Sequence, residues 1–135
     1  MTIAAATHPS ITSVLVVDDS AFARHGAILC LRSAGLANAH FVEAGNGHEA
    51  LTALKREHID LVVTDMNMPE MNGAELLDRI KSDERVSGVA VLVVSSSIST
   101  AMETDLRSKG AKAVARKPLS GAATMILLKS LVEEV

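Results

Sequence analysis

The sequence predicts a doubly wound α/β domain, in which a five-stranded parallel sheet carries five helices packed on both of its faces. Two observations support this prediction. Short apolar runs alternate with segments of helical spacing, so that a strand followed by a helix recurs five times along the chain. The runs are nearly uninterrupted Val and Leu, as expected for strands that are buried on both faces. Right-handed crossovers between parallel strands then place helices on both sides of the sheet.

Caps and turns mark the first two strands and helices. The first strand covers 14–17, and Ser20 can cap the helix that follows it. Gly35 can end this helix in a left-handed conformation, whereas Gly26 weakens it by about 1 kcal/mol relative to Ala unless close packing requires glycine there. A short strand over 39–43 precedes a turn at Gly45-Asn46-Gly47. The second helix then places three apolar residues on one side, at Ala50, Leu51 and Leu54.

The second half of the chain continues the alternation. A third strand covers 61–64, and the Pro and Gly residues of 66–73 exclude a regular element there, so we expect a loop that can bend around a bound group. The remaining predicted elements are a helix with Leu76, Leu77 and Ile80, a strand over 89–94, a helix over 100–109 that closes at Gly110, a strand over 113–116, and a final amphipathic helix over 122–135 with Ile126, Leu127 and Leu131.

Length and composition agree with a single domain of this kind. The 135 residues are 48% hydrophobic, which excludes a disordered chain and suffices for one core. The segment 1–12 is small, polar and without periodicity, so we predict a flexible leader there and one domain over 13–135. Phe22 and Phe41 are the only aromatic residues, so the core must be built from aliphatic and Met side chains.

Composition also disfavours several partners and locations. The net charge is -3 and no basic run is present, so direct binding of nucleic acid is not expected. No apolar stretch approaches the roughly 20 residues of a membrane span, and the N-terminus lacks an export pattern, so we expect a cytoplasmic protein with no membrane partner. The single cysteine, Cys30, lies among apolar residues and is predicted to be a buried core thiol in a reducing compartment.

Four strands each deliver polar residues at their C-terminal ends. These residues are Asp18 and Asp19, Asp65, Ser95, and Lys117. Taken singly, each is more often a helix cap or a surface residue, but the carboxyl ends of parallel strands meet at one edge of a sheet. Carboxylates held close together repel one another and normally require a cation. Oxygen ligands suit Mg²⁺, and no cluster of Cys and His suits zinc.

The same residues fit phosphoryl chemistry. A carboxylate is a competent nucleophile toward phosphorus and gives an aspartyl phosphate. Catalysis of phosphoryl transfer is mostly the placing of cations and donors around the equatorial oxygens. Lys117 and Mg²⁺ would supply positive charge, and Ser95 would supply a hydroxyl donor.

The order of these residues closely resembles the receiver domain of bacterial two-component response regulators, over residues 13 to 135. The resemblance is carried by Asp18-Asp19, by Asp65-Met66-Asn67-Met68-Pro69 with Asn72-Gly73, by Ser95 and by Lys117-Pro118. It implies a flavodoxin-like sheet of order 2-1-3-4-5 and a cis bond before Pro118. It also implies a stand-alone, chemotaxis-regulator-like signalling protein that is not an enzyme beyond accepting its own phosphoryl group and losing it.

The resemblance assigns a role to each site residue. Asp65 would be the phosphoacceptor, with a histidine kinase or histidine phosphotransferase as the donor. Asp18, Asp19, Asp65 and the backbone carbonyl of Asn67 would hold Mg²⁺. Ser95 would contact the phosphoryl group, and Lys117 would pair with it.

Three further positions concern the lifetime of the aspartyl phosphate and the way in which phosphorylation changes the surface of the protein. By the resemblance, Asn67 and Ser97 tune hydrolysis, and their small polar side chains favour a short-lived phosphate, although they can equally be a turn residue and a helix cap. Val114 stands where the family usually carries Tyr or Phe as a switch, so the aromatic step is missing. We expect Ser95 to move toward the phosphoryl group and carry the helix over 100–109 with it. A downstream signalling protein would dock on the face formed by that helix, the strand over 113–116 and the final helix.

Other functions stay open from the sequence. The chain could be a shuttle or sink in a phosphorelay, or a receiver-like binding module that works without phosphate. A haloacid-dehalogenase-like phosphatase would need an acidic partner two residues after its nucleophile, and this chain has Asp18-Asp19-Ser20-Ala21 at that place. A monomer and a phosphorylation-linked dimer are both compatible with the sequence.

Overall fold

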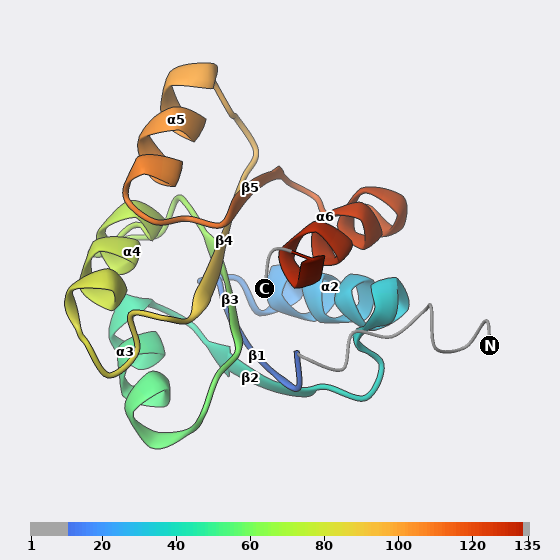
Figure 1. The fold of residues 1–135 in the computed structure, drawn as a ribbon, viewed down its shortest axis with the longest axis horizontal. Coiled ribbons are helices and arrows are strands. Elements are labelled where there is room, and N and C mark those ends of the chain that lie inside the picture. Colours follow the sequence, from blue (N-terminus) through green and yellow to red (C-terminus); the bar gives the residue numbers. More distant parts are fainter. Residues whose placement is uncertain (1–10, 134–135) are drawn as a thin grey trace.

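A computed structural model describes residues 11–133, which form a parallel five-stranded sheet between two layers of helices (Figure 1). The strands are β1 (Ser13–Val17), β2 (His40–Ala44), β3 (Leu61–Asp65), β4 (Ala90–Ser95) and β5 (Ala113–Arg116). Their spatial order is β2-β1-β3-β4-β5, and every neighbouring pair is parallel, so the predicted fold class and strand order are confirmed. The predicted leader over 1–12 lies almost wholly outside the described residues.

The helices divide between the two faces of the sheet. They are α2 (Ala21–Leu31), the π-helical turn η1 (Arg32–Leu36), α3 (Gly47–Arg56), α4 (Gly73–Ser82), α5 (Thr100–Ser108) and α6 (Gly121–Glu133). In Figure 1, α2 and α6 cover one face, and α3, α4 and α5 cover the other. Ser20 caps α2 by accepting a hydrogen bond from the backbone N–H of Ala23, as predicted. Gly35 has a φ of 125°, the left-handed conformation predicted there.

Alternation along the strands divides the core into two parts. In β1, Leu15 and Val17 pack on the side of α3, α4 and α5, whereas Val14 and Val16 pack on the side of α2 and α6. All five residues of β1 and all five of β3 are buried. This explains why the central strands lack polar alternation in the sequence.

Two sequence predictions about the layer of α2 and α6 are wrong. Of the residues predicted for the inward face of α6, Leu131 is buried and Leu127 packs against the core, but Ile126 is 71% exposed, and Thr124 and Leu128 are buried in its place. Cys30 is half-buried rather than in the core, and its Sγ lies 3.4 Å from the Thr124 Oγ1 between the two helices. Within residues 11–133, no helix has the length and apolar character of a membrane span.

Candidate functional site

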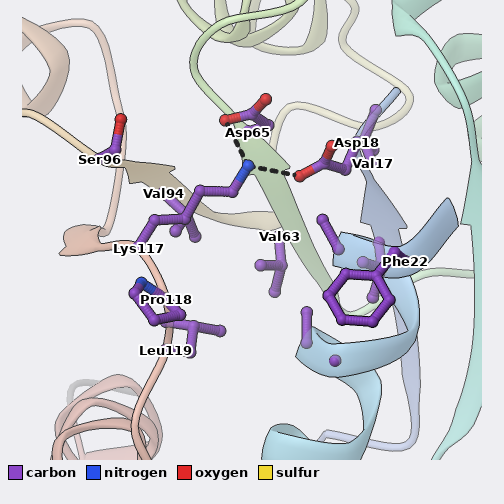
Figure 2. Close-up of a pocket in the computed structure, with 14 residues that line it drawn as sticks. Val17, Asp18, Phe22, Val63, Asp65, Val94, Ser96, Lys117, Pro118 and Leu119 are labelled. Atoms are coloured by element: carbon purple, nitrogen blue, oxygen red, sulfur yellow. Dashed lines mark ion pairs between the residues drawn. The ribbon is translucent and has the colours of Figure 1, made fainter. Parts of the chain in front are cut away.

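Three strand ends bring two carboxylates and one ammonium group together at the carboxyl edge of the sheet (Figure 2). The Lys117 Nζ lies 2.8 Å from the Asp18 Oδ2 and 3.3 Å from the Asp65 Oδ1. The side chains of Asp18 and Asp65 are only 8% and 6% exposed, whereas that of Lys117 is 31% exposed. The site is therefore a half-open cluster in which one cation bridges two buried anions.

Asp19 completes an acidic triad. One carboxylate oxygen from each of Asp18, Asp19 and Asp65 lies within 4.8 Å of the other two, and Asp19 is the exposed member. In the part of the chain that the structure describes, this is the only such group of His, Cys, Asp or Glu residues. Its ligand atoms are all hard oxygens on one open side, a set that suits Mg²⁺ better than zinc.

Hydrogen bonds hold the acidic turn after β1 in place. The Asp18 backbone N–H donates to the Ala44 carbonyl at 3.1 Å, and the Ser20 backbone N–H donates to the Asp18 Oδ1 at 2.9 Å. Arg24 donates through Nη1 to the Asp18 carbonyl at 2.7 Å and through Nε to the Glu43 Oε1 at 2.9 Å. Arg24 thereby ties the turn to the end of β2. Sequence patterns did not predict this role for Arg24, although its place in the first turns of the helix after Asp18 was a possible signal.

The loop after Asp65 packs closely against the strand end. A Cβ at Gly73 would lie 2.6 Å from the Asp65 carbonyl oxygen, so a larger residue there would displace the loop. Asn72 caps α4 in a capping box with Glu75. The irregular segment predicted over 66–73 therefore ends at Asn72, because Gly73 already belongs to α4. Asn67 is exposed two residues beyond Asp65.

The electrostatics of the cluster favour an added cation. Burial raises the pKa of Asp65, and the negative charge of Asp18 raises it further, although Lys117 and the backbone N–H of Asn67 oppose both effects. Burial lowers the pKa of Lys117, but hydrogen bonding and attraction to Asp18, followed by Asp65, outweigh it, so the pKa is raised. One ammonium group does not balance the negative charge of this site.

Ser95, the last residue of β4, interacts with Ser97 in the loop that follows. Ser95 is 1% exposed, and its Oγ donates to the Ser97 carbonyl at 2.9 Å. The Lys117 backbone N–H donates to the Ser95 carbonyl at 2.9 Å, which joins the ends of β4 and β5. The structure thus places Ser95 next to the cluster with its hydroxyl engaged within its own loop.

The strand that carries Lys117 has no aromatic side chain. Val114 is half-buried and packs against the core on the side of α3, α4 and α5. Phe22 lies on α2 and is 89% exposed, and Phe41 lies in β2 with the Arg32 guanidinium 5.3 Å from its ring centre. The Lys117-Pro118 bond is cis, as the sequence resemblance implied.

The sheet order and the acidic cluster facing a lysine at its carboxyl edge define a receiver-like α/β domain. Residues 14–129 match the profile of the response regulator receiver domain, and the chain belongs to this family. Domains of this CheY-like kind are signalling proteins rather than enzymes in the usual sense, and they interact with histidine kinases and downstream targets.

Similar proteins span nearly the whole chain. The chemotaxis protein CheY-3 of Vibrio cholerae is 32% identical over 122 residues, which cover 90% of this chain and 92% of that protein. The chemotaxis protein CheY of Pseudomonas aeruginosa is also 32% identical over 122 residues, covering 90% and 94%. Among solved structures, Vibrio cholerae CheY4 superposes with a TM-score of 0.78 at 26% identity, covering 93% of this chain and 99% of that one. A response regulator receiver protein from Pseudomonas putida gives 0.77 at 29% identity, covering 88% and 96%.

Proposed function

We propose that this protein is a cytoplasmic response regulator that accepts a phosphoryl group on Asp65 from a histidine kinase or histidine phosphotransferase. The observation that carries the proposal is the position of the Asp65 carboxylate, which is buried at a strand end, 3.3 Å from Lys117 and within the acidic triad. The chain would accept and lose its own phosphoryl group, and it would not turn over other substrates.

The proposed transfer of the phosphoryl group forms one bond to phosphorus and breaks another. A carboxylate oxygen of Asp65 attacks phosphorus, and the bond between phosphorus and the donor imidazole nitrogen breaks. The electron pair of that bond stays on the imidazole, and the new bond joins the Asp65 oxygen to phosphorus. Because the phosphoryl group spreads charge over its equatorial oxygens, the surrounding donors determine the rate.

The residues of the triad fit a magnesium ion. Asp18, Asp19 and Asp65 would hold it together with the backbone carbonyl of Asn67, and it would supply positive charge to the phosphoryl oxygens. Lys117 bridges Asp18 and Asp65, and its ammonium would leave Asp18 and pair with a phosphoryl oxygen. Ser95 would give up its bond to the Ser97 carbonyl and donate to another phosphoryl oxygen.

Loss of the phosphoryl group would depend on access for water. Asn67 and Ser97 are both exposed near the cluster and carry small polar side chains. They leave space for an attacking water, which favours a short-lived aspartyl phosphate.

Output would arise from the loop between β4 and α5. Movement of Ser95 toward phospho-Asp65 would break its hydrogen bond to Ser97, and α5 begins three residues later at Thr100. The face formed by α5, β5 and α6 would change, and a downstream signalling protein would bind there, with or without phosphorylation-linked dimerisation. Val114 cannot act as an aromatic switch, so this loop would carry the coupling.

Phosphorylation with acetyl phosphate and Mg²⁺, followed by intact-mass spectrometry, tests the proposal. The wild-type chain is expected to gain one phosphoryl group, and the Asp65→Asn variant is expected to gain none. Asp60→Asn is the matched control, because Asp60 immediately precedes the other end of β3 and lies outside the acidic triad. If neither acetyl phosphate nor any of a set of autophosphorylated kinases modifies the wild-type chain, the proposal is contradicted. A binding module that works without phosphate would then be favoured.

A further inference from the structure

The peptide that joins Asp18 to Asp19 has a charged hydrogen-bond donor. Its oxygen, the Asp18 carbonyl, accepts a bond from the Arg24 Nη1 at 2.7 Å. A hydrogen bond from a charged group of this kind is roughly twice as strong as one between neutral groups. Because the orientation of this peptide sets the direction in which the Asp19 side chain leaves the turn, Arg24 acts on Asp19 through the backbone.

The Asp19 carboxylate depends on this peptide more than the other two carboxylates of the triad do. Asp18 and Asp65 are buried and pair with Lys117, and the Asp18 carboxylate also accepts a bond from the Ser20 backbone N–H. Asp19 is exposed, and among the described residues its carboxylate has no hydrogen-bond or ion-pair partner. The backbone of the turn therefore determines where the Asp19 carboxylate lies.

Arg24 is itself fixed by a second bond. Its Nε donates to the Glu43 Oε1 at 2.9 Å, and the next residue of β2, Ala44, accepts from the Asp18 backbone N–H. Only 18% of the Arg24 side chain is exposed. A planar guanidinium that makes both bonds has little freedom to rotate, and neither an ammonium nor an amide group reproduces this geometry.

We propose that Arg24 is a positioning residue of the magnesium site, which orients Asp19 before the ion binds. The inference rests on the proposed function, because it concerns the ion that would assist transfer to Asp65. Residues that orient metal ligands typically contribute about 10- to 100-fold to the affinity for the metal. Arg24 has the same sign of charge as Mg²⁺, so its charge alone would weaken binding of the ion. Positioning and charge therefore predict opposite effects when Arg24 is replaced by a neutral residue.

Titration with MgCl₂, followed by the NMR chemical shift of the Asp19 backbone amide, measures the affinity. We expect Arg24→Gln and Arg24→Lys to raise the dissociation constant for Mg²⁺ by about tenfold, because neither side chain makes both bonds. Glu43→Gln removes only the charged anchor of Arg24, so a smaller rise is expected. The same spectra show whether each variant is folded, and Glu43→Gln carries the test if Arg24→Gln is not.

The dependence of phosphorylation on Mg²⁺ gives a second readout. With acetyl phosphate as the donor, the half-saturating Mg²⁺ concentration should rise in Arg24→Gln by the same factor as the dissociation constant. The rate at saturating Mg²⁺ should stay within about twofold of the wild-type rate, because the reacting groups are unchanged.

Arg107→Gln is the matched control. Arg107 also donates through Nε to a glutamate, at 3.0 Å from the Glu103 Oε2, and through Nη1 to a backbone carbonyl, at 3.0 Å from the Lys112 oxygen. It lies on α5, outside the acidic triad and the turn after β1. This variant should bind Mg²⁺ like the wild type.

Three results would overturn the positioning role. The first is an unchanged or tighter dissociation constant in Arg24→Gln, and the second is the wild-type value in Arg24→Lys, because charge rather than the paired bonds would then be responsible. The third is a wild-type chain that binds no Mg²⁺. A wild-type chain that binds Mg²⁺ but accepts no phosphoryl group refutes the proposed function instead, and the titration still decides the role of Arg24.

Discussion

Two carboxylates at opposite ends of β3 differ in their electrostatic surroundings: Asp60 immediately precedes the strand, and Asp65 is its last residue. At the amino end, the Asp60 Oδ2 accepts hydrogen bonds from the Thr12 backbone N–H and Oγ1, both at 2.8 Å, and from the Ser13 backbone N–H at 3.0 Å, while its Oδ1 lies 2.8 Å from the His58 Nε2. Burial raises the pKa of Asp60, but these bonds outweigh it and lower the pKa overall. At the carboxyl end, burial and Asp18 raise the pKa of Asp65.

The difference separates a carboxylate with structural contacts from the one that we propose as the phosphoacceptor. Asp60 is stabilised as an anion by the chain itself and fastens the start of β1 to the start of β3. Asp65 is an anion in a site with too little positive charge, a condition that an incoming cation can relieve. The following predictions test this contrast.

The largest effect is expected at the amino end. Asp60→Asn removes the charge that these donors stabilise, and it should lower the free energy of unfolding by about 2 kcal/mol. Because the folded pKa of Asp60 is lowered, this contribution is present above its ordinary value of 3.8 and is lost as pH falls through the folded pKa. Urea unfolding at pH 7 and at acid pH measures both effects. Equal deficits at the two pH values would show that the charge is not responsible.

Binding of Mg²⁺ at the carboxyl end of β3 should change the free energy of unfolding by less than Asp60→Asn does. At a free concentration ten times the dissociation constant, one bound ion raises the free energy of unfolding by about 1.4 kcal/mol. We expect a rise in Tm for the wild type and for Asp60→Asn, and a much smaller rise for Asp18→Asn, which loses one charged ligand. Calorimetry with and without Mg²⁺ measures this difference. An undiminished rise in Asp18→Asn would remove Asp18 from the metal site.

The smallest effect is expected for Asp65→Asn, which should stabilise the protein, whereas Asp60→Asn destabilises it. Without Mg²⁺ at pH 7, Asp65→Asn should raise Tm, because the neutral amide avoids the burial and repulsion that disfavour the carboxylate. The folded pKa of Asp65 is raised, so the gain should be complete above that pKa and vanish below the ordinary value of 3.8. Thermal unfolding followed by circular dichroism across this pH range checks the sign. A lower Tm at pH 7 would show that the ion pair with Lys117 dominates.

The strand ends could be predicted from the sequence because they follow directly from local patterns. Runs of Val and Leu locate the central strands, and parallel pairing then brings Asp18, Asp65 and Lys117 together without further information. The inward face of α6 could be predicted only in part: Leu127 and Leu131 pack on the core as expected, but Ile126 does not. Residues 125–128 are four consecutive apolar residues, and helical spacing alone does not choose among them. Packing against α2 decides this, and it places Thr124 and Leu128 inward.

Features that depend on tertiary contacts were also missed. Arg24 binds both the Asp18 carbonyl and Glu43, and the second contact requires β2 to lie beside the turn after β1. An apolar pocket beside Asp65 is lined by Gly26 on α2 and by Pro118 and Leu119 after β5, although these segments are far apart in the sequence. The bond from the Ser95 hydroxyl to the Ser97 carbonyl depends on the conformation of one loop, which no local pattern specifies.

The aliphatic core has a practical consequence for spectroscopy. The chain contains no Trp and no Tyr, so it has no intrinsic fluorescence from either residue. A single Trp introduced as Phe22→Trp would be the only such fluorophore and would line the apolar pocket beside Asp65. Its emission would report on the solvent exposure of that one position without a background from the rest of the molecule. Because the chain has no other Trp and no Tyr, the fluorescence of this one residue can be assigned directly to the surroundings of the site.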